Sequence, residues 1–174
     1  SVLMLMLFGS WANAQCTLTA NKLKACRGSS INFSIPQTTS FDHITWSFGN
    51  GDSSVQPTNS VSYIYDTFGT FTACVTLYNA DNTVKCGPSC VTITIFDRPS
   101  AGLILPPQNI MCFENNYFCF KDSSFMGKSK APIQSYLWDF GDGDSSTTQD
   151  PCKTYGTDGV YTILITVRDT NGCW

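Results

Sequence analysis

Three stretches of the chain alternate between apolar and polar residues. They are "FTACVTL" at 71–77, "CVTITIF" at 90–96 and "YTILITV" at 161–167. In a β-strand, residues two apart share a face, so the alternation puts the apolar side chains on one side and the threonines on the other. We therefore expect half-buried strands and an all-β fold.

A longer pattern repeats along the chain. "WSFGNG" at 46–51 reappears as "WDFGDG" at 138–143, and "YDTFGTF" at 65–71 reappears as "YGTDGVY" at 155–161. The distance along the chain between the two copies exceeds the repeat period of solenoid proteins. It indicates tandem domains that each bury their own core. We expect one domain at 15–98 and a second at 99–174 that stops before its last strand. Pro99 breaks the strand pattern between them, so residues 15–98 should fold alone.

The repeated hexapeptide predicts a core strand followed by a tight hairpin. Trp46 and Phe48 share one face of that strand, and the Asn-Gly and Asp-Gly pairs tolerate the positive φ of the turn. With about seven strands per copy, the pattern favours an immunoglobulin-like Greek-key sandwich. The motif positions are Trp46, Phe48, Gly49, Asn50, Gly51, Tyr65 and Gly69 in the first copy, and Trp138, Phe140, Gly141, Asp142, Gly143, Tyr155 and Gly159 in the second.

The N-terminus predicts export. "VLMLMLF" at 2–8 is a short apolar run, and "ANA" at 12–14 follows it like a signal-peptidase site, so residues 1–14 are interpreted as part of a signal peptide. The run is too short for a transmembrane helix. A net charge of −3 and a pI near 4.8 leave no basic stripe for nucleic acid. The expected location is secreted or on the cell surface.

These landmarks resemble the PKD (polycystic kidney disease) domain, an extracellular β-sandwich. The resemblance rests on W-x-F-G-[DN]-G, then Pro57 or Pro151, then the tyrosine and the glycine four residues later. It implies non-catalytic spacer or adhesion modules of a larger secreted protein, with a protein or glycan surface and further domains of the chain as partners. The alternative is an accessory region that holds substrate for a secreted hydrolase.

No catalytic or cofactor site is predicted. Glu114 is the only glutamate and His43 the only histidine, and His43 lies out of phase with the inward side chains. Asp139, Asp142 and Asp144 could supply oxygen ligands to calcium, but their spacing differs from that of an EF-hand loop. A solvated turn is the competing and preferred interpretation.

Nine cysteines fit an oxidising compartment, and their odd number leaves one unpaired. Matching places in the two copies predict Cys26–Cys86 and Cys112–Cys173. Cys119 and Cys152 share the outer face of the second copy, which predicts a third bridge. Cys16–Cys90 is the remaining expected pair, with Cys74 free.

Overall fold

The structure is a computed structural model that describes residues 16–36 and 40–174. The expected signal peptide lies outside these residues. The described residues form strands and loops, and none of them belongs to a helix that could cross a membrane. The described residues form two compact units. Of these residues, unit 1 contains those within 16–23, 30–64 and 70–94, and unit 2 contains 24–29, 65–69 and 95–174.

Unit 2 therefore includes two segments of the first sequence repeat, Lys24–Ser29 and Tyr65–Gly69. The sequence gives no sign of this, because it places these residues inside the first repeat. The boundary at 98/99 stays a prediction.

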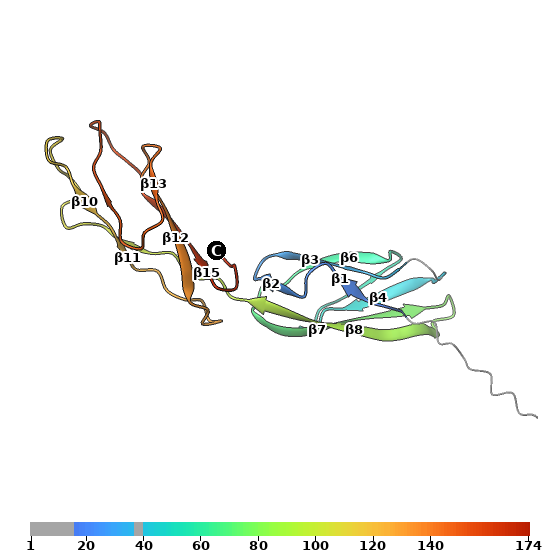
Figure 1. Ribbon diagram of the computed structural model, residues 1–174. Helices are drawn as coiled ribbons and strands as arrows, with labels where there is room; N and C mark the ends of the chain where they lie inside the picture. The colour runs from blue at the N-terminus through green and yellow to red at the C-terminus, as the bar shows by residue number, and fades with distance from the viewer. Residues whose placement is uncertain (1–15, 37–39) are drawn as a thin grey trace, which may run out of the picture. The chain divides into compact units, whose positions relative to one another are not determined.

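The first repeat supplies a sheet in the order β1-β3-β6 and a second sheet in the order β2-β8-β7-β4-β5 (Figure 1). The strands are β1 (Thr19–Ala20), β2 (Lys24–Cys26), β3 (Ser30–Ser34), β4 (His43–Ser47), β5 (Ser53–Gln56), β6 (Ser60–Ile64), β7 (Gly69–Tyr78) and β8 (Val84–Phe96).

The second repeat supplies the three-stranded sheet β13-β12-β15 and the pairs β10-β14 and β11-β9. Its strands are β9 (Leu103–Ile104), β10 (Phe118–Cys119), β11 (Lys121–Asp122), β12 (Ile133–Asp139), β13 (Ser145–Ser146), β14 (Cys152–Lys153) and β15 (Leu164–Asp169).

The predicted alternation determines the core of each repeat. In β4 and β7, Ile44, Trp46, Val75 and Leu77 are each at most 1% exposed. Trp46 lies opposite Val75, and in the second repeat Trp138 lies opposite Ile165, which is the same register at equivalent positions. The two hexapeptides therefore build the same hairpin on the same core strand.

The main difference between the repeats lies at the strand predicted over 161–167. In the first repeat β7 runs from Gly69 and lies between β4 and β8. In the second, β15 begins only at Leu164, and β12 is its one neighbouring strand within the described residues. Among these residues, Val160–Ile163 make no backbone hydrogen bond. Without a second neighbour, the first half of the expected strand has no ladder to join.

Candidate functional site: an acidic turn and an aromatic groove

The acidic turn of the second repeat is bound by a lysine of the same unit. The ammonium of Lys153, on β14, lies 2.7 Å from a carboxylate oxygen of Asp142 and also contacts Asp144. Its side chain is 11% exposed and lies over the rings of Phe140 and Tyr155, at 5.7 and 5.5 Å from their centroids. Lys153 thus bonds two of the three aspartates that the sequence offered as calcium ligands.

These contacts shift the pKa of both partners. The hydrogen bond from Lys153 holds the pKa of Asp142 below its ordinary value, and the two aspartates raise the pKa of Lys153. The third aspartate, Asp139, accepts a hydrogen bond from the backbone N–H of Gly141 at 2.9 Å, as in an Asx turn. Within the described residues no cluster of three metal-ligating side chains is present. The arrangement favours the structural interpretation of the turn.

The equivalent turn in the first repeat is bonded by a tyrosine in place of a lysine. The Asn50 side-chain amide donates to the hydroxyl of Tyr63 at 2.7 Å, and that hydroxyl donates to Asp52. Tyr63 also stacks on Phe48, with ring centroids 3.8 Å apart. Both repeats therefore bond the turn to the second strand after it, to β6 through a tyrosine hydroxyl and to β14 through an ammonium.

The disulfides correct most of the expected pairing. The bonds are Cys16–Cys86, Cys26–Cys173, Cys74–Cys90 and Cys119–Cys152, and Cys112 is free. The predictions of Cys26–Cys86, Cys112–Cys173 and Cys16–Cys90, and of a free Cys74, were wrong. The Cys119–Cys152 bridge is present, with the two residues directly opposite each other on β10 and β14.

The length of β8 explains the first error. Arg27 donates its backbone N–H to Phe96, so Cys26 lies beside the far end of β8. Cys86 is nine or ten residues back along that strand, which is roughly 30 Å at 3.3 Å per residue. The N–H of Leu18 instead bonds the hydroxyl of Ser89, which brings the N-terminal segment and Cys16 to Cys86.

The other errors concern local geometry. Cys74 and Cys90 lie on adjacent strands, β7 and β8, with Cα atoms 4.1 Å apart, so they bond each other. In unit 2, the loop before β10, which carries Cys112, and the C-terminal residues lie at opposite ends (Figure 1). A bond between Cys112 and Cys173 is therefore out of reach.

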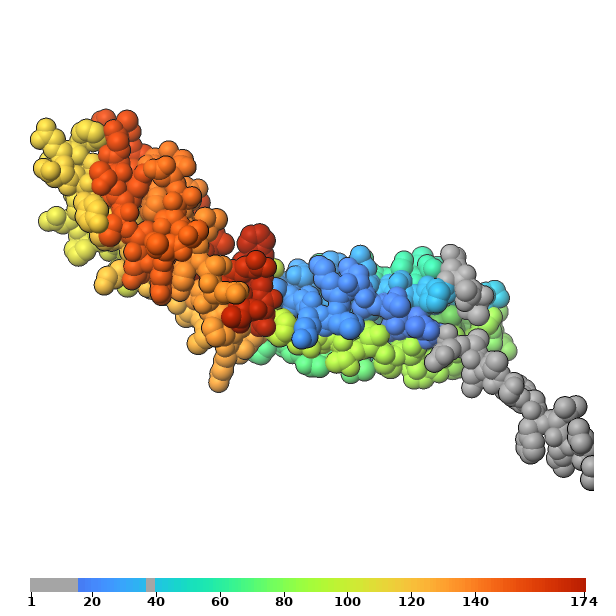
Figure 2. Space-filling view, viewed as in Figure 1, coloured from blue at the N-terminus to red at the C-terminus, as the bar shows by residue number. Residues whose placement is uncertain are grey.

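Unit 2 contains a groove of about 570 Å³ between the loop before β10 and the segment before β15. The two segments lie side by side on the surface, yellow and orange-red in Figure 2. The lining of the groove is mainly aromatic and aliphatic, and the one charged residue in it is Asp158. The lining residues are Leu105, Pro106, Asn109, Ile110, Met111, Phe113, Asn116, Phe118, Phe120, Tyr155, Thr157, Asp158, Gly159, Val160, Tyr161 and Ile163.

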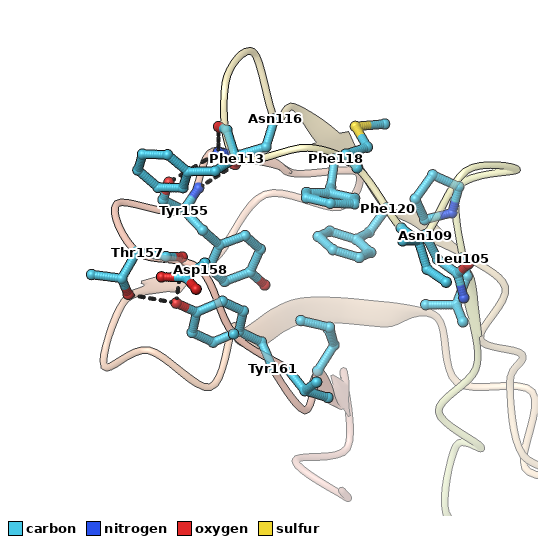
Figure 3. Close-up of a pocket in the computed structure, with 16 residues that line it drawn as sticks. Leu105, Asn109, Phe113, Asn116, Phe118, Phe120, Tyr155, Thr157, Asp158 and Tyr161 are labelled. Carbon is cyan, nitrogen blue, oxygen red and sulfur yellow. Dashed lines mark hydrogen bonds between the residues drawn. The ribbon is translucent and has the colours of Figure 1, made fainter.

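Hydrogen bonds and ring stacking hold the wall of the groove in place (Figure 3). Asn116 is 7% exposed, and its amide accepts from the N–H of Tyr155 at 2.6 Å and donates to the Tyr155 carbonyl at 3.1 Å. The Tyr155 ring stacks on Tyr161 with centroids 4.0 Å apart, and the Tyr161 hydroxyl donates to the Thr157 carbonyl at 2.8 Å. The aromatic wall is therefore held in place by hydrogen bonds and stacking.

The rim of the groove is apolar and open. Val160 is fully exposed, Ile110 is 89% exposed and Phe113 is 53% exposed. These exposed apolar side chains around one groove are a candidate interaction surface. The lining includes Val160–Ile163, whose counterparts in the first repeat belong to β7 and lie next to β8, the strand position that the second repeat is expected to lack. Sequence analysis missed it, because alternation predicted a continuous strand over 161–167.

Comparison with known families accounts for both repeats. Profiles of the PKD domain match residues 11–87 and 111–174. The chain consists of two PKD domains in tandem. These matches and the paired sheets confirm the predicted all-β, immunoglobulin-like sandwich class.

The curated relatives of these PKD domains are bacterial proteases. Collagenase ColA of Bacillus cereus is 53% identical over 40 residues, which are 23% of this chain and 4% of that protein. The microbial collagenase of Vibrio alginolyticus is 48% identical over 40 residues, 23% of this chain and 5% of the relative. Pre-pro-metalloprotease PrtV of Vibrio cholerae is 46% identical over 44 residues, 25% of this chain and 5% of the relative. The chain thus matches only a twentieth or less of their length.

Among solved structures, the fibronectin(III)-like modules of Clostridium thermocellum CbhA are similar, with a TM-score of 0.46 and 13% identity. That alignment covers 90% of this chain and 88% of the other.

The protease relatives place the PKD domains in the secreted or cell-surface compartment, as the sequence predicted. PKD domains are typically non-catalytic modules.

The residues considered for catalysis lie apart from the groove. His43 stacks on Tyr78 in the first repeat and bonds Asp42 at 2.9 Å. Glu114 is exposed in the loop before β10 and is not among the groove-lining residues. Within the described residues, the hydrogen-bond partner of the His43 side chain is Asp42, and the Glu114 side chain makes no hydrogen bond or ion pair, so neither is bonded to a nucleophile.

Proposed function

We propose that the two PKD domains are a non-catalytic accessory region that holds a polypeptide substrate for a secreted protease. The observation that carries the proposal is the aromatic groove of unit 2, in a domain whose relatives are proteases. Of the two functions considered from the sequence, substrate holding is supported by these relatives.

An extended peptide suits this groove better than a globular partner. Val160–Ile163 leave their backbone donors and acceptors without partners among the described residues, and such groups can bond an added strand. Alternate side chains of that peptide would enter between the aromatic rings. Asp158 is the only charge in the lining, so a lysine or arginine in the peptide would be favoured there.

Binding to immobilised polypeptides tests the proposal. The chain should bind gelatin, whose unfolded strands offer extended segments, more tightly than it binds chitin. The variant Ile110→Ser/Val160→Ser should weaken gelatin binding at least about tenfold, because it removes apolar contact area from the rim. Both residues are exposed, so the fold should survive the change.

Val55→Ser is the matched control, because Val55 is 64% exposed on β5, outside the groove. It should bind gelatin as the unchanged chain does. Equal affinity of all three proteins for gelatin would refute a role for the groove. Preference for chitin would favour glycan adhesion, and absence of binding to both would favour a spacer.

A further inference from the structure

Cys112 is the one cysteine of the chain outside a disulfide. It is exposed, in the loop before β10. The other eight cysteines are bonded, and thiols of exported proteins are normally paired. The repeat architecture indicates what kind of group Cys112 should bond, and this inference is independent of the groove's proposed function.

Cys112 occupies the place in the second repeat that Cys26 occupies in the first. In both repeats the cysteine precedes two apolar residues that are two positions apart, Ile31 and Phe33 on β3 or Phe118 on β10 and Phe120 just after it. The structure adds an independent correspondence. Shortly after Cys26, the N–H of Gly28 donates to the carbonyl of Tyr65 at 2.9 Å. Shortly after Cys112, the amide of Asn116 donates to the carbonyl of Tyr155, the equivalent tyrosine, at 3.1 Å.

Cys26 shows what a cysteine at this position does. It is bonded to Cys173, with Cα atoms 5.6 Å apart, in the Asn-Gly-Cys turn that follows β15. Segment Lys24–Ser29 is part of unit 2. The cysteine that begins the first repeat is therefore bonded within the unit that the next repeat builds.

We propose that Cys112 forms the same bond with a further PKD domain, to a cysteine in the turn after that domain's equivalent of β15. We place the partner in a further domain, because both equivalent cysteines of this chain, Cys173 in the turn after β15 and Cys86 on β8, are already bonded. Cys173 bonds Cys26, and its first-repeat equivalent, Cys86, bonds Cys16. Cys16 has no cysteine counterpart at the start of the second repeat. PKD domains would thus be joined by one bridge from each domain to the next.

The position of Cys112 suits such a bond. Its loop lies at the opposite end of unit 2 from the Cys26–Cys173 turn (Figure 1). The bond is a two-electron oxidation in which both thiols lose their protons and an S–S bond forms. The two electrons reduce a disulfide oxidant, either oxidised glutathione or a thiol–disulfide oxidoreductase, to two thiols.

Peptide mapping without reduction tests the proposal on the protein exported by its natural host. The peptide that contains Cys112 should be linked to a peptide with Cys in an Asn-Gly-Cys turn of another PKD domain. Mobility on non-reducing gels then separates a bond within one polypeptide from a bond between two. A free Cys112, a Cys112–Cys112 dimer or a bond to an unrelated sequence would overturn the proposal.

Discussion

Lys153 is the residue that bonds the aspartates of the acidic turn in place of a metal ion. A carboxylate cluster at a hairpin can bind a metal ion or can be neutralised by a side chain of the same domain. Here the ammonium lies within bonding distance of Asp142 and Asp144 and under little solvent exposure. Because the first repeat fastens the same turn through Tyr63, we interpret the contact as structural in both.

Lys153→Met should lower the melting temperature of unit 2 at pH 7. Asp142 has a lowered pKa in the folded state, so its contribution is present above the ordinary aspartate value and is lost as pH falls through the folded pKa. Lys153 has a raised pKa, so its contribution is present below the ordinary lysine value and is lost as pH rises through the folded pKa. The destabilisation should therefore be largest near neutrality and shrink at about pH 2.

Lys121→Met is the matched control, because Lys121 is exposed and makes no ion pair within the described residues. Calorimetry from acid to neutral pH measures all three proteins. If Lys153→Met and Lys121→Met had the same melting temperature at every pH, the turn would not depend on the ammonium. The unchanged chain should also melt at the same temperature with and without calcium, because Lys153 already bonds two of the three carboxylates of the turn.

The two glycines of each hairpin have different roles, one in close packing against a neighbouring segment and one in the turn itself. Gly141 and Gly143 both have positive φ, 77° and 94°. A Cβ at Gly141 would lie 2.7 Å from the carbonyl oxygen of Thr162, whereas a Cβ at Gly143 would meet no atom within 4 Å. The first repeat has the same contrast between Gly49 and Gly51. The first glycine permits close packing on the neighbouring segment, and the second only completes the turn.

Gly143→Ala should cost about 1 kcal/mol of unfolding free energy, the penalty of a left-handed conformation for a residue with a Cβ. Gly141→Ala should cost about 1–3 kcal/mol more than Gly143→Ala, because backbone atoms of Thr162 must move. Denaturant unfolding of unit 2 compares the two variants. A smaller loss for Gly141→Ala than for Gly143→Ala would show that the contact with Thr162 is easily relieved.

The Cys119–Cys152 bridge stabilises a pair of very short strands. β10 and β14 have two residues each, so their ladder alone contributes little. The bridge closes a loop with a sequence separation of 33. Its loss in Cys119→Ser/Cys152→Ser should cost about 4 kcal/mol by loop entropy. Denaturant unfolding measures the loss of unfolding free energy. A variant as stable as the unchanged chain would show that the bridge does not stabilise the fold by restricting the unfolded state.

At the scale of the whole molecule, the second repeat depends on residues of the first. Unit 2 includes Lys24–Ser29 and Tyr65–Gly69, and the carboxylate of Asp97 binds both the Arg27 side chain, at 3.3 Å, and the backbone N–H of Lys128, at 2.9 Å. The N–H of Lys128 lowers the pKa of Asp97, with a further contribution from Arg27. The Cys26–Cys173 bond joins the same segment to the end of the chain.

Loss of that bond should therefore destabilise unit 2. Cys26→Ser/Cys173→Ser opens a loop with a sequence separation of 147, which corresponds to about 5 kcal/mol by loop entropy. The control Cys74→Ser/Cys90→Ser opens a separation of only 16 and lies in unit 1. Hydrogen exchange read by peptide should show faster exchange across 118–169 in the first variant and not in the second. Faster exchange across 118–169 in both variants, or in neither, would contradict this role of the bond.

The sequence alone determined everything that depends on neighbours a few residues apart. Alternation determined which side chains enter the core, so Trp46, Trp138 and their strands are where the pattern puts them. Asn-Gly and Asp-Gly determined the hairpins, and parity along two strands determined that Cys119 and Cys152 share a face. Repetition of these local signals was enough to indicate the PKD family.

Tertiary structure decided what depends on residues far apart in the chain. The bonds of Cys26 and Cys86 followed from their places at opposite ends of β8, Cys86 on the strand and Cys26 beside its far end. Local parity is the same at both ends. Lys153 reached the acidic turn only because β14 runs past it. The groove is lined by Val160–Ile163, which have no strand partner among the described residues, and alternation in one strand carries no information about which strand lies beside it.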